Sequence, residues 1–171
     1  SKVIVNGGTF VGPKGTSADS GSAVNVQSGS EVTINGGTFS KGKNKTLACG
    51  GTLKVFGGVY DQDPTAFLTE GYIVLVDGSS YTVVNGTKAN DESSLKDALV
   101  NGDSDVIALS DDIDISDGAA PYVHIGREVV VNGQGNLLEV GNNANYGVFC
   151  NAGSDVTFDN IDLVSNGGGI V

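Results

Sequence analysis

The densest group of residues that could bind a ligand is an acidic run in the second half of the chain. Four carboxylates fall within seven residues, those of Asp111, Asp112, Asp114 and Asp117. Carboxylate oxygens are ligands that Ca²⁺ prefers in proteins, so these four side chains are candidate Ca²⁺ ligands. Their spacing matches neither an EF-hand loop nor the glycine-rich repeats of calcium-binding β-rolls. A solvated acidic loop is therefore the alternative interpretation.

A second acidic pattern lies on a strand, where Asp155, Thr157 and Asp159 alternate with Val156 and Phe158. Alternation predicts that the two apolar residues point inward and the other three point outward. Glycoside hydrolysis needs two carboxylates close to the scissile bond. Alternate strand residues are about 7 Å apart, which puts Asp155 and Asp159 too far apart for a tight pair. We therefore interpret this row as a solvated face.

The single arginine and the single histidine of the chain are the remaining candidates for catalysis. Arg127 follows a glycine at a predicted turn, and we expect Glu128 to be its partner at the surface. His124 shares a strand face with Tyr122 and has no cysteine or histidine at metal-ligand spacing. No P-loop, nucleophile elbow or zinc-protease motif is present. The sequence therefore predicts a protein that is not an enzyme.

The two cysteines lie in separate halves of the chain, each in an apolar strand context. We interpret Cys49 and Cys150 as small buried core residues, because free cysteine is usually buried. Their number is too small for a disulfide-dense scaffold.

Three repeats in the first half indicate the architecture. Each has a short strand of alternating inward and outward residues, a turn rich in glycine and asparagine, and an aromatic residue. The aromatic side chain is expected to fold back onto the core. The repeats are Lys2–Phe10, Glu31–Phe39 and Thr52–Tyr60. Their offsets of 29 and 21 residues suit one turn of a solenoid, in which stacked coils bury a shared core.

The segments after these repeats do not continue the same pattern. Two strands at 72–76 and 81–84 predict a β-hairpin that caps a solenoid end. A polar linker is expected at 85–90, and a short helix at 91–100 with Asp91 as its N-cap. Seven strands are predicted beyond the helix, at 106–109, 113–115, 122–125, 129–131, 137–140, 148–150 and 156–161. The helix is expected to cap the start of a second solenoid.

This order predicts two regions, 1–84 as final coils with a C-terminal cap and 91–171 as an N-terminal cap with first coils. Coils without a cap are then expected at both ends of the chain. Two explanations are open: the chain was cut from a tandem array at coil boundaries, or neighbouring chains stack end to end into a filament. Missing targeting signals say nothing about where the parent protein resides.

Charge is distributed unequally between the two regions. Residues 1–84 hold six lysines and six acidic residues, whereas residues 85–171 hold three basic and fourteen acidic residues, a net charge of −11. A nucleic-acid partner would be repelled by the second region and would find no basic patch in the first. No apolar run is long enough to cross a membrane.

The glycine-punctuated repeats resemble the right-handed parallel β-helices of the pectin-lyase-like superfamily. Residues 154–161 and the helix-then-strand segment 94–109 carry the same resemblance. Within that superfamily the repeats are most similar to those of bacterial cell-surface, adhesin-like proteins. The resemblance implies a fold and not an activity. The repeats and the missing catalytic groups favour a non-catalytic structural module at the cell surface or outside the cell. The coils without a cap add end-to-end homo-oligomers as an expectation, and carbohydrate is a further expected partner. A carbohydrate-active β-helix protein and a phage fibre or spike component are the alternatives, because this fold hosts many functions.

Overall fold

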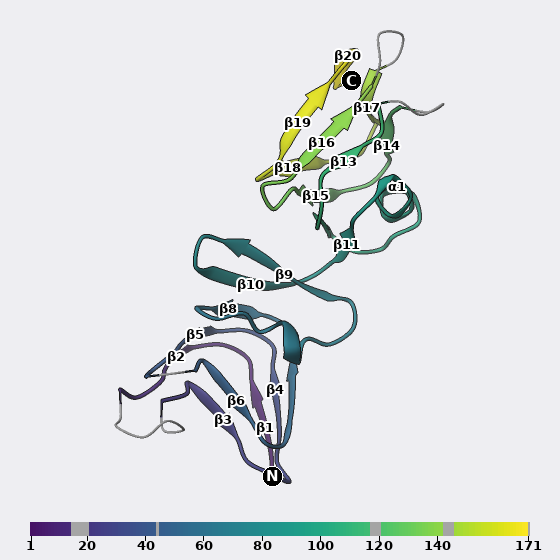
Figure 1. Ribbon diagram of the computed structural model, residues 1–171. Helices are drawn as coiled ribbons and strands as arrows, with labels where there is room; N and C mark the ends of the chain where they lie inside the picture. The colour runs from purple at the N-terminus through teal and green to yellow at the C-terminus, as the bar shows by residue number, and fades with distance from the viewer. Residues whose placement is uncertain (15–20, 44, 117–120, 142–145, 171) are drawn as a thin grey trace. The chain divides into compact units, whose positions relative to one another are not determined.

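The computed structural model describes residues 1–14, 21–43, 45–116, 121–141 and 146–170. The chain forms two compact units, Ser1–Asn85 (unit 1) and Gly86–Val171 (unit 2). Parallel strands stack into about six solenoid turns in all, with one short helix (Figure 1). The predicted parallel β-helix is confirmed. The assignment of the regions to the end of one solenoid and the start of another stays a prediction.

Unit 1 stacks three coils, whose equivalent strands pair side by side. The first sheet contains β1 (Lys2–Val5), β4 (Glu31–Ile34) and β7 (Thr52–Val55). The second contains β2 (Thr9–Val11), β5 (Thr38–Ser40) and β8 (Gly58–Tyr60), and the third contains β3 (Val24–Val26) and β6 (Leu47–Cys49). These neighbours are all parallel, so each repeat found in the sequence is one coil.

An aromatic ladder fills the core of unit 1, as the repeats predict. Phe10, Phe39 and Tyr60 stack nearly parallel, with ring centroids 5.0 and 4.9 Å apart. Phe39 is completely buried between its two neighbours. The Tyr60 hydroxyl donates to the Gly57 carbonyl at 2.8 Å, and burial raises the pKa of Tyr60 above its ordinary value.

The turn before each ladder ring needs glycine. Gly8, Gly37 and Gly58 occupy the same place in successive coils, with φ of 110°, 123° and 111°. Side chains other than hydrogen rarely accept this conformation. A Cβ at Gly37 would also lie 3.0 Å from the Gly8 carbonyl oxygen of the coil before it. The repeated glycine therefore both reverses the chain and lets the coils approach.

A β-hairpin covers the last coil of unit 1, as predicted. The hairpin consists of β9 (Tyr72–Asp77) and β10 (Ser80–Asn85), which follow a 3₁₀ turn, η1 (Thr65–Phe67). β10 pairs antiparallel with β8. The hairpin thus occupies a strand edge that would otherwise invite further pairing.

Unit 2 contains a cap strand and three coils. One sheet holds β11 (Thr87–Ala89), β12 (Val106–Leu109), β15 (Val129–Asn132) and β18 (Val156–Asp159). The other two sheets hold β13 (Ile113–Asp114), β16 (Leu137–Val140) and β19 (Asp162–Ser165), and β14 (Val123–Ile125), β17 (Tyr146–Cys150) and β20 (Gly168–Ile170). All of these pairs are parallel.

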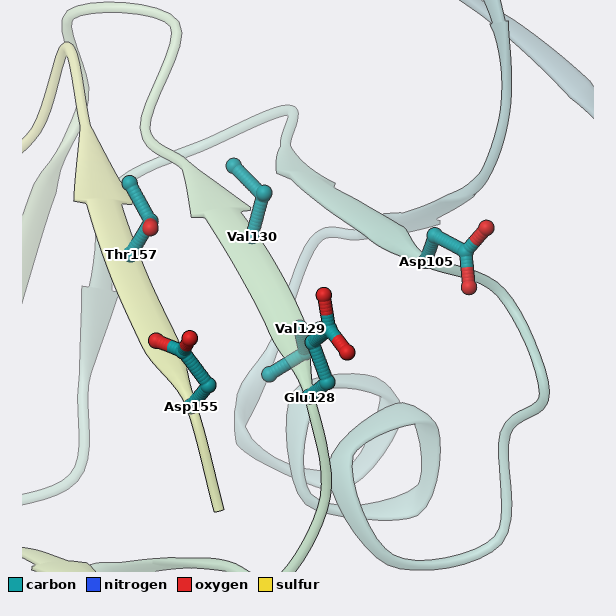
Figure 2. A pocket seen from close by; sticks show the side chains of 6 residues that line it. All are labelled: Asp105, Glu128, Val129, Val130, Asp155 and Thr157. Carbon is teal, nitrogen blue, oxygen red and sulfur yellow. The ribbon is translucent and has the colours of Figure 1, made fainter.

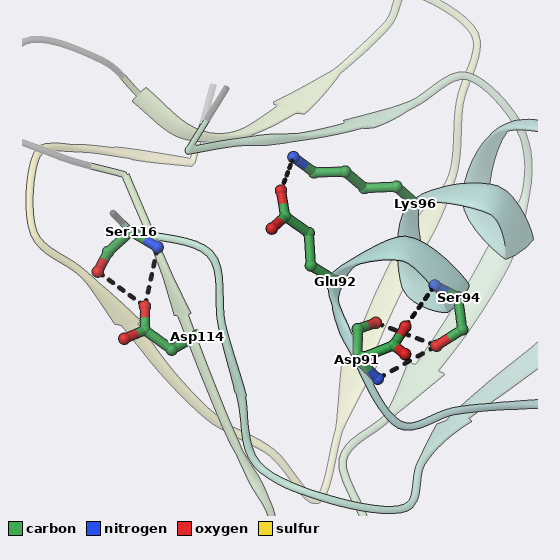
Figure 3. A network of polar contacts seen from close by, with 6 residues as sticks. All are labelled: Asp91, Glu92, Ser94, Lys96, Asp114 and Ser116. Atoms are coloured by element: carbon green, nitrogen blue, oxygen red, sulfur yellow. Dashed lines mark hydrogen bonds and ion pairs between the residues drawn. The ribbon is translucent and has the colours of Figure 1, made fainter. Parts of the chain in front are cut away.

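Helix α1 (Glu92–Val100) packs on the first coil of unit 2 through Leu95, Ala98 and Leu99, all buried. The predicted N-cap is confirmed. The Asp91 carboxylate accepts from the Ser94 backbone N–H at 2.7 Å, and the Ser94 hydroxyl lies 3.1 Å from the Asp91 N–H (Figure 3). Bonds from the Ser94 N–H and hydroxyl hold the pKa of Asp91 below its ordinary value.

Polar side chains also stack from coil to coil at the turn after the first strand. In unit 1 the Asn35 Nδ2 donates to the Asn6 Oδ1 at 2.8 Å. In unit 2 the buried Asn132 donates from Nδ2 to the Asp159 Oδ2 at 2.7 Å. We call these two rows the amide ladders.

Two sequence predictions of local structure are wrong. The segment 85–90, predicted as a polar linker, contains β11, because pairing with β12 orders it and buries Ala89. The strand predicted at 156–161 ends at Asp159, because Asn160 has a φ of 46° and turns the chain into β19.

The prediction of two buried cysteines is also wrong. Cys49 is exposed at the end of β6, although it is in register with the buried Val26, and Cys150 is only partly buried. Both thiols are free.

Candidate functional site

The acidic run 111–117 is divided among separate local hydrogen bonds. Asp111 accepts from the Asp112 N–H at 2.9 Å, and Asp112 accepts from the Leu137 N–H at 2.8 Å. Asp114 accepts from the Ser116 N–H at 2.8 Å and from its hydroxyl at 2.7 Å, which lowers the pKa of Asp114 (Figure 3). Each carboxylate therefore stabilises a turn or the next coil.

The Ca²⁺ prediction stays a prediction. Asp117, the fourth candidate ligand, lies outside the described residues. Within the described ranges, no group of three or more histidine, cysteine or acidic side chains is placed to hold a metal ion.

A carboxylate groove of about 390 Å³ runs across the start of the sheet β12–β15–β18. Its lining includes Asp105, Glu128 and Asp155, with Val130 and Thr157 beside them. Figure 2 shows the three carboxylates coming from three neighbouring coils. All three acidic residues are exposed to solvent. Sequence analysis treats them separately, because only the parallel register brings them together.

The predicted outward row on β18 is confirmed. Thr157 and Asp159 are exposed, whereas Val156 and Phe158 are partly buried against the core of unit 2. Asp159 belongs to the amide ladder and Asp155 lines the carboxylate groove. These two carboxylates therefore lie in different surroundings and do not form a pair.

Arg127 has a structural role that its sequence neighbours do not reveal. Its guanidinium donates to the Ser104 carbonyl at 2.7 Å and to the Ala98 carbonyl, near the end of α1, at 3.1 Å. Its contact with Glu128 is to the backbone carbonyl, at 3.3 Å, and not to the carboxylate expected as its surface partner. Arg127 thus fastens the cap helix to the first coil, because guanidinium groups suit several acceptors at once.

An aromatic cluster lies on the outer face of the sheet β14–β17. His124 stacks on Phe149 with centroids 4.9 Å apart, and Tyr122 meets both rings edge-on. The predicted shared face of His124 and Tyr122 is confirmed, but Phe149 joins it only through register with His124. The Lys96 ammonium lies 5.9 Å from the Tyr122 ring centroid.

Two adjoining hollows border this aromatic cluster, and both include Leu99, Val100 and His124. One has a volume of about 260 Å³ and adds Gly126, Arg127 and Asn151; the other, about 150 Å³, adds Lys96 and Tyr122. A polar ring-shaped ligand can contact the exposed His124 ring, the partly buried rings of Tyr122 and Phe149, and the cation and amide beside them.

Two other tyrosines, which could also offer rings to a sugar, pack against the core of unit 1. Tyr72 and Tyr81 are partly buried against the core of unit 1, and Tyr72 meets Phe56 edge-on. The side chain of Tyr146 is outside the described part of the structure.

The outer coil of unit 1 leaves core positions exposed. Val3 is in register with the buried Val32, yet it is 50% exposed. On the same coil, the outward-pointing Ile4 and Val11 add further apolar surface, 56% and 66% exposed. Among the described residues, β1 pairs only with β4 and β2 only with β5, so one backbone edge of each strand is unpaired.

The parallel coils, the cap helix and the hairpin define a β-solenoid protein. Residues 86–171 match the family model described as a pectate lyase-like adhesive domain. No curated protein and no solved structure in the comparisons matches the chain. Since the match covers half of its length, the chain belongs to the pectate lyase-like adhesive domain family. No described helix is long and apolar enough to span a membrane.

Proposed function

We propose that this chain is a non-catalytic adhesive module that acts outside the cell or at its surface and assembles end to end. The exposed outer coil of unit 1 carries the proposal. Its inward side chains and unpaired strand edges are what a further coil would cover. An adhesin benefits from such stacking, because a stiff row of coils carries its binding surfaces away from the cell.

The geometry of the polar groups favours a structural role over catalysis. The guanidinium of Arg127 is bound to backbone carbonyl groups. The carboxylates of Asp111, Asp112 and Asp114 accept bonds from backbone N–H groups. These contacts stabilise turns and the cap helix and leave the same atoms less available for proton transfer or metal binding.

We further propose carbohydrate as the adhesive ligand, contacted by the aromatic cluster of Tyr122, His124 and Phe149. Aromatic ring faces stack on the apolar faces of sugars, and amide and cationic groups bind hydroxyl groups. Asn151 and Lys96 line the adjoining hollows. The test is a glycan array. The His124→Ala, Tyr122→Ala double variant is expected to lose binding to those polysaccharides that the unmodified chain binds. A Tyr72→Ala variant is the control, because Tyr72 packs in unit 1.

Assembly is tested by sedimentation velocity and negative-stain electron microscopy over a concentration series. We expect mass to rise with concentration and short rods to appear. A single monomeric species at all concentrations would overturn the assembly part of the proposal.

The carbohydrate-active alternative has one observation in its favour, the carboxylate groove of Asp105, Glu128 and Asp155. Polysaccharide cleavage is measured with and without Ca²⁺ on acidic and neutral substrates. We expect no turnover above the buffer control. Turnover that Glu128→Gln abolishes would identify an enzyme.

A further inference from the structure

We propose that two copies of this chain join in one fixed register. In this register each residue of β1 and β2 in unit 1 pairs with the residue numbered 153 higher, in β18 and β19 of unit 2 of another copy. This inference rests on the end-to-end assembly proposed above. Both coils follow the same spacing. The inward residues Val3, Val5 and Phe10 match Val156, Phe158 and Leu163 at that single offset. The step from Val5 to Phe10 is therefore as long in sequence as the step from Phe158 to Leu163.

The inward apolar side chains of the first coil of unit 1 and of the last coil of unit 2 are incompletely covered in the single chain. Val5 and Phe10 are partly buried against the core of unit 1. Val156, Phe158 and Leu163 are partly buried against the core of unit 2. Equivalent residues one coil further in, such as Ile34 and Phe39, are completely buried. Stacking the two faces would extend both cores by the usual step of the solenoid and remove this apolar surface from water.

The amide ladders fix the direction and register of the joint. In unit 1 the Asn6 Oδ1 accepts from Asn35, so the Asn6 amide nitrogen is the group left to donate outward. In unit 2 the Asp159 Oδ2 accepts from Asn132, so the Asp159 Oδ1 is left to accept. At the offset of 153 these two residues are partners. A donor thus meets a carboxylate, which makes a charge-assisted hydrogen bond.

The charges along the outer row are complementary in the same register. Lys2 would lie beside Asp155, next to which the groove also holds Glu128. Within unit 1, Lys2 already neighbours Glu31 on the adjoining strand. A lysine between two acidic residues suits a joint between the neutral unit 1 and the strongly acidic unit 2.

Cysteine cross-linking between separately made variants tests the register. The background carries Cys49→Ser and Cys150→Ala, and the four variants are Ile4→Cys, Thr157→Cys, Val11→Cys and Val164→Cys. All four sites are exposed and lie on outward positions. Neighbouring strands lie about 4.8 Å apart, within the Cα separation of about 4.4–6.8 Å that a disulfide spans.

The register predicts which mixtures form a disulfide-linked heterodimer on oxidation. Ile4→Cys with Thr157→Cys, and Val11→Cys with Val164→Cys, should give at least about tenfold more heterodimer than the crossed mixtures. The crossed mixtures, Ile4→Cys with Val164→Cys and Val11→Cys with Thr157→Cys, use the same four proteins and are the matched controls. Equal yields in matched and crossed mixtures would overturn the register.

A charge reversal at the amide ladder tests the donor. Asn6→Asp keeps the oxygen that accepts from Asn35 but presents a carboxylate to Asp159. We expect the association constant to fall about tenfold or more, while the melting temperature of unit 1 stays unchanged. Asp159→Asn in the same chain restores a donor and should recover association. A double variant no better than Asn6→Asp would contradict the pairing.

These results separate the two proposals. If sedimentation detects no association of the unmodified chain, the end-to-end assembly itself fails. If the chain associates but cross-links equally in all mixtures, assembly stands and only the 153-residue register is wrong.

Discussion

Unit 1 and unit 2 are both stacks of three coils, yet their cores and caps differ. Unit 1 is electrically neutral and centres on stacked aromatic rings, and an antiparallel hairpin closes its last coil. Unit 2 has a net charge of −11, and a helix held by Arg127 covers its first coil. Among its described residues, the fully buried side chains of the core cluster are all aliphatic. The same solenoid geometry thus accepts an aromatic or an aliphatic core. The requirement is that each coil places apolar side chains at the same inward positions as the coils beside it.

Removing a ring of the aromatic ladder should produce the largest difference in stability between the two units. Phe39→Ala deletes a fully buried ring between Phe10 and Tyr60. The cost should be about 3–5 kcal/mol of the stability of unit 1. Hydrogen exchange read by mass spectrometry should therefore show faster exchange in peptides of 1–85 and unchanged exchange in 86–171. Equal acceleration in both units would mean that they unfold as one.

The cap helix of unit 2 gives the next largest effect. Arg127→Met keeps the length of the side chain but removes its bonds to the carbonyls of Ala98 and Ser104. We expect unit 2 to lose about 1–3 kcal/mol, with α1 exchanging first. Lys88→Met is the control, because Lys88 is exposed. An unchanged α1 in Arg127→Met would show that apolar packing alone holds the helix.

The hairpin turn of unit 1 should respond more weakly. Gly78 has a φ of 56° and open space around its Cα, so Gly78→Ala tests backbone strain without a clash. We expect a loss of about 1 kcal/mol, measured by urea unfolding. Gly7→Ala is the matched control, since Gly7 also has open space and no φ in the left-handed region. Equal losses would exclude strain as the cause.

The smallest expected effect is the loss of stability of unit 2 in acid. Hydrogen bonds within unit 2 lower the pKa values of Asp91 and Asp114. The stability that these bonds add to unit 2 is fully present above the ordinary carboxyl pKa. That stability is lost as pH falls below about 4 and through the lowered values. Thermal melts from about pH 5 to 2 should therefore decline less steeply for an Asp91→Asn, Asp114→Asn variant. An identical decline would assign the acid sensitivity to other groups.

Sequence patterns predicted the coils where local signals and packing agree. The Asn-Gly-Gly turn and the following aromatic residue placed the ladder of unit 1, and Asp91 marked the start of α1. β11 was missed because Thr87–Ala89 has little strand character of its own and depends on pairing with β12. The carboxylate groove and the bonds of Arg127 were missed for a related reason. They join residues from different coils, which only the register brings together.

The aromatic ladder also makes unit 1 its own optical reporter. The chain has no tryptophan and five tyrosines, so near-ultraviolet signals come from few rings. Tyr60 is the ring on the last coil of the stack, and burial keeps its hydroxyl protonated beyond the ordinary tyrosine pKa of about 10. Phenolate absorbance from this ring should therefore appear only when the ladder opens at high pH. An alkaline titration would thus time the opening of unit 1 without any label.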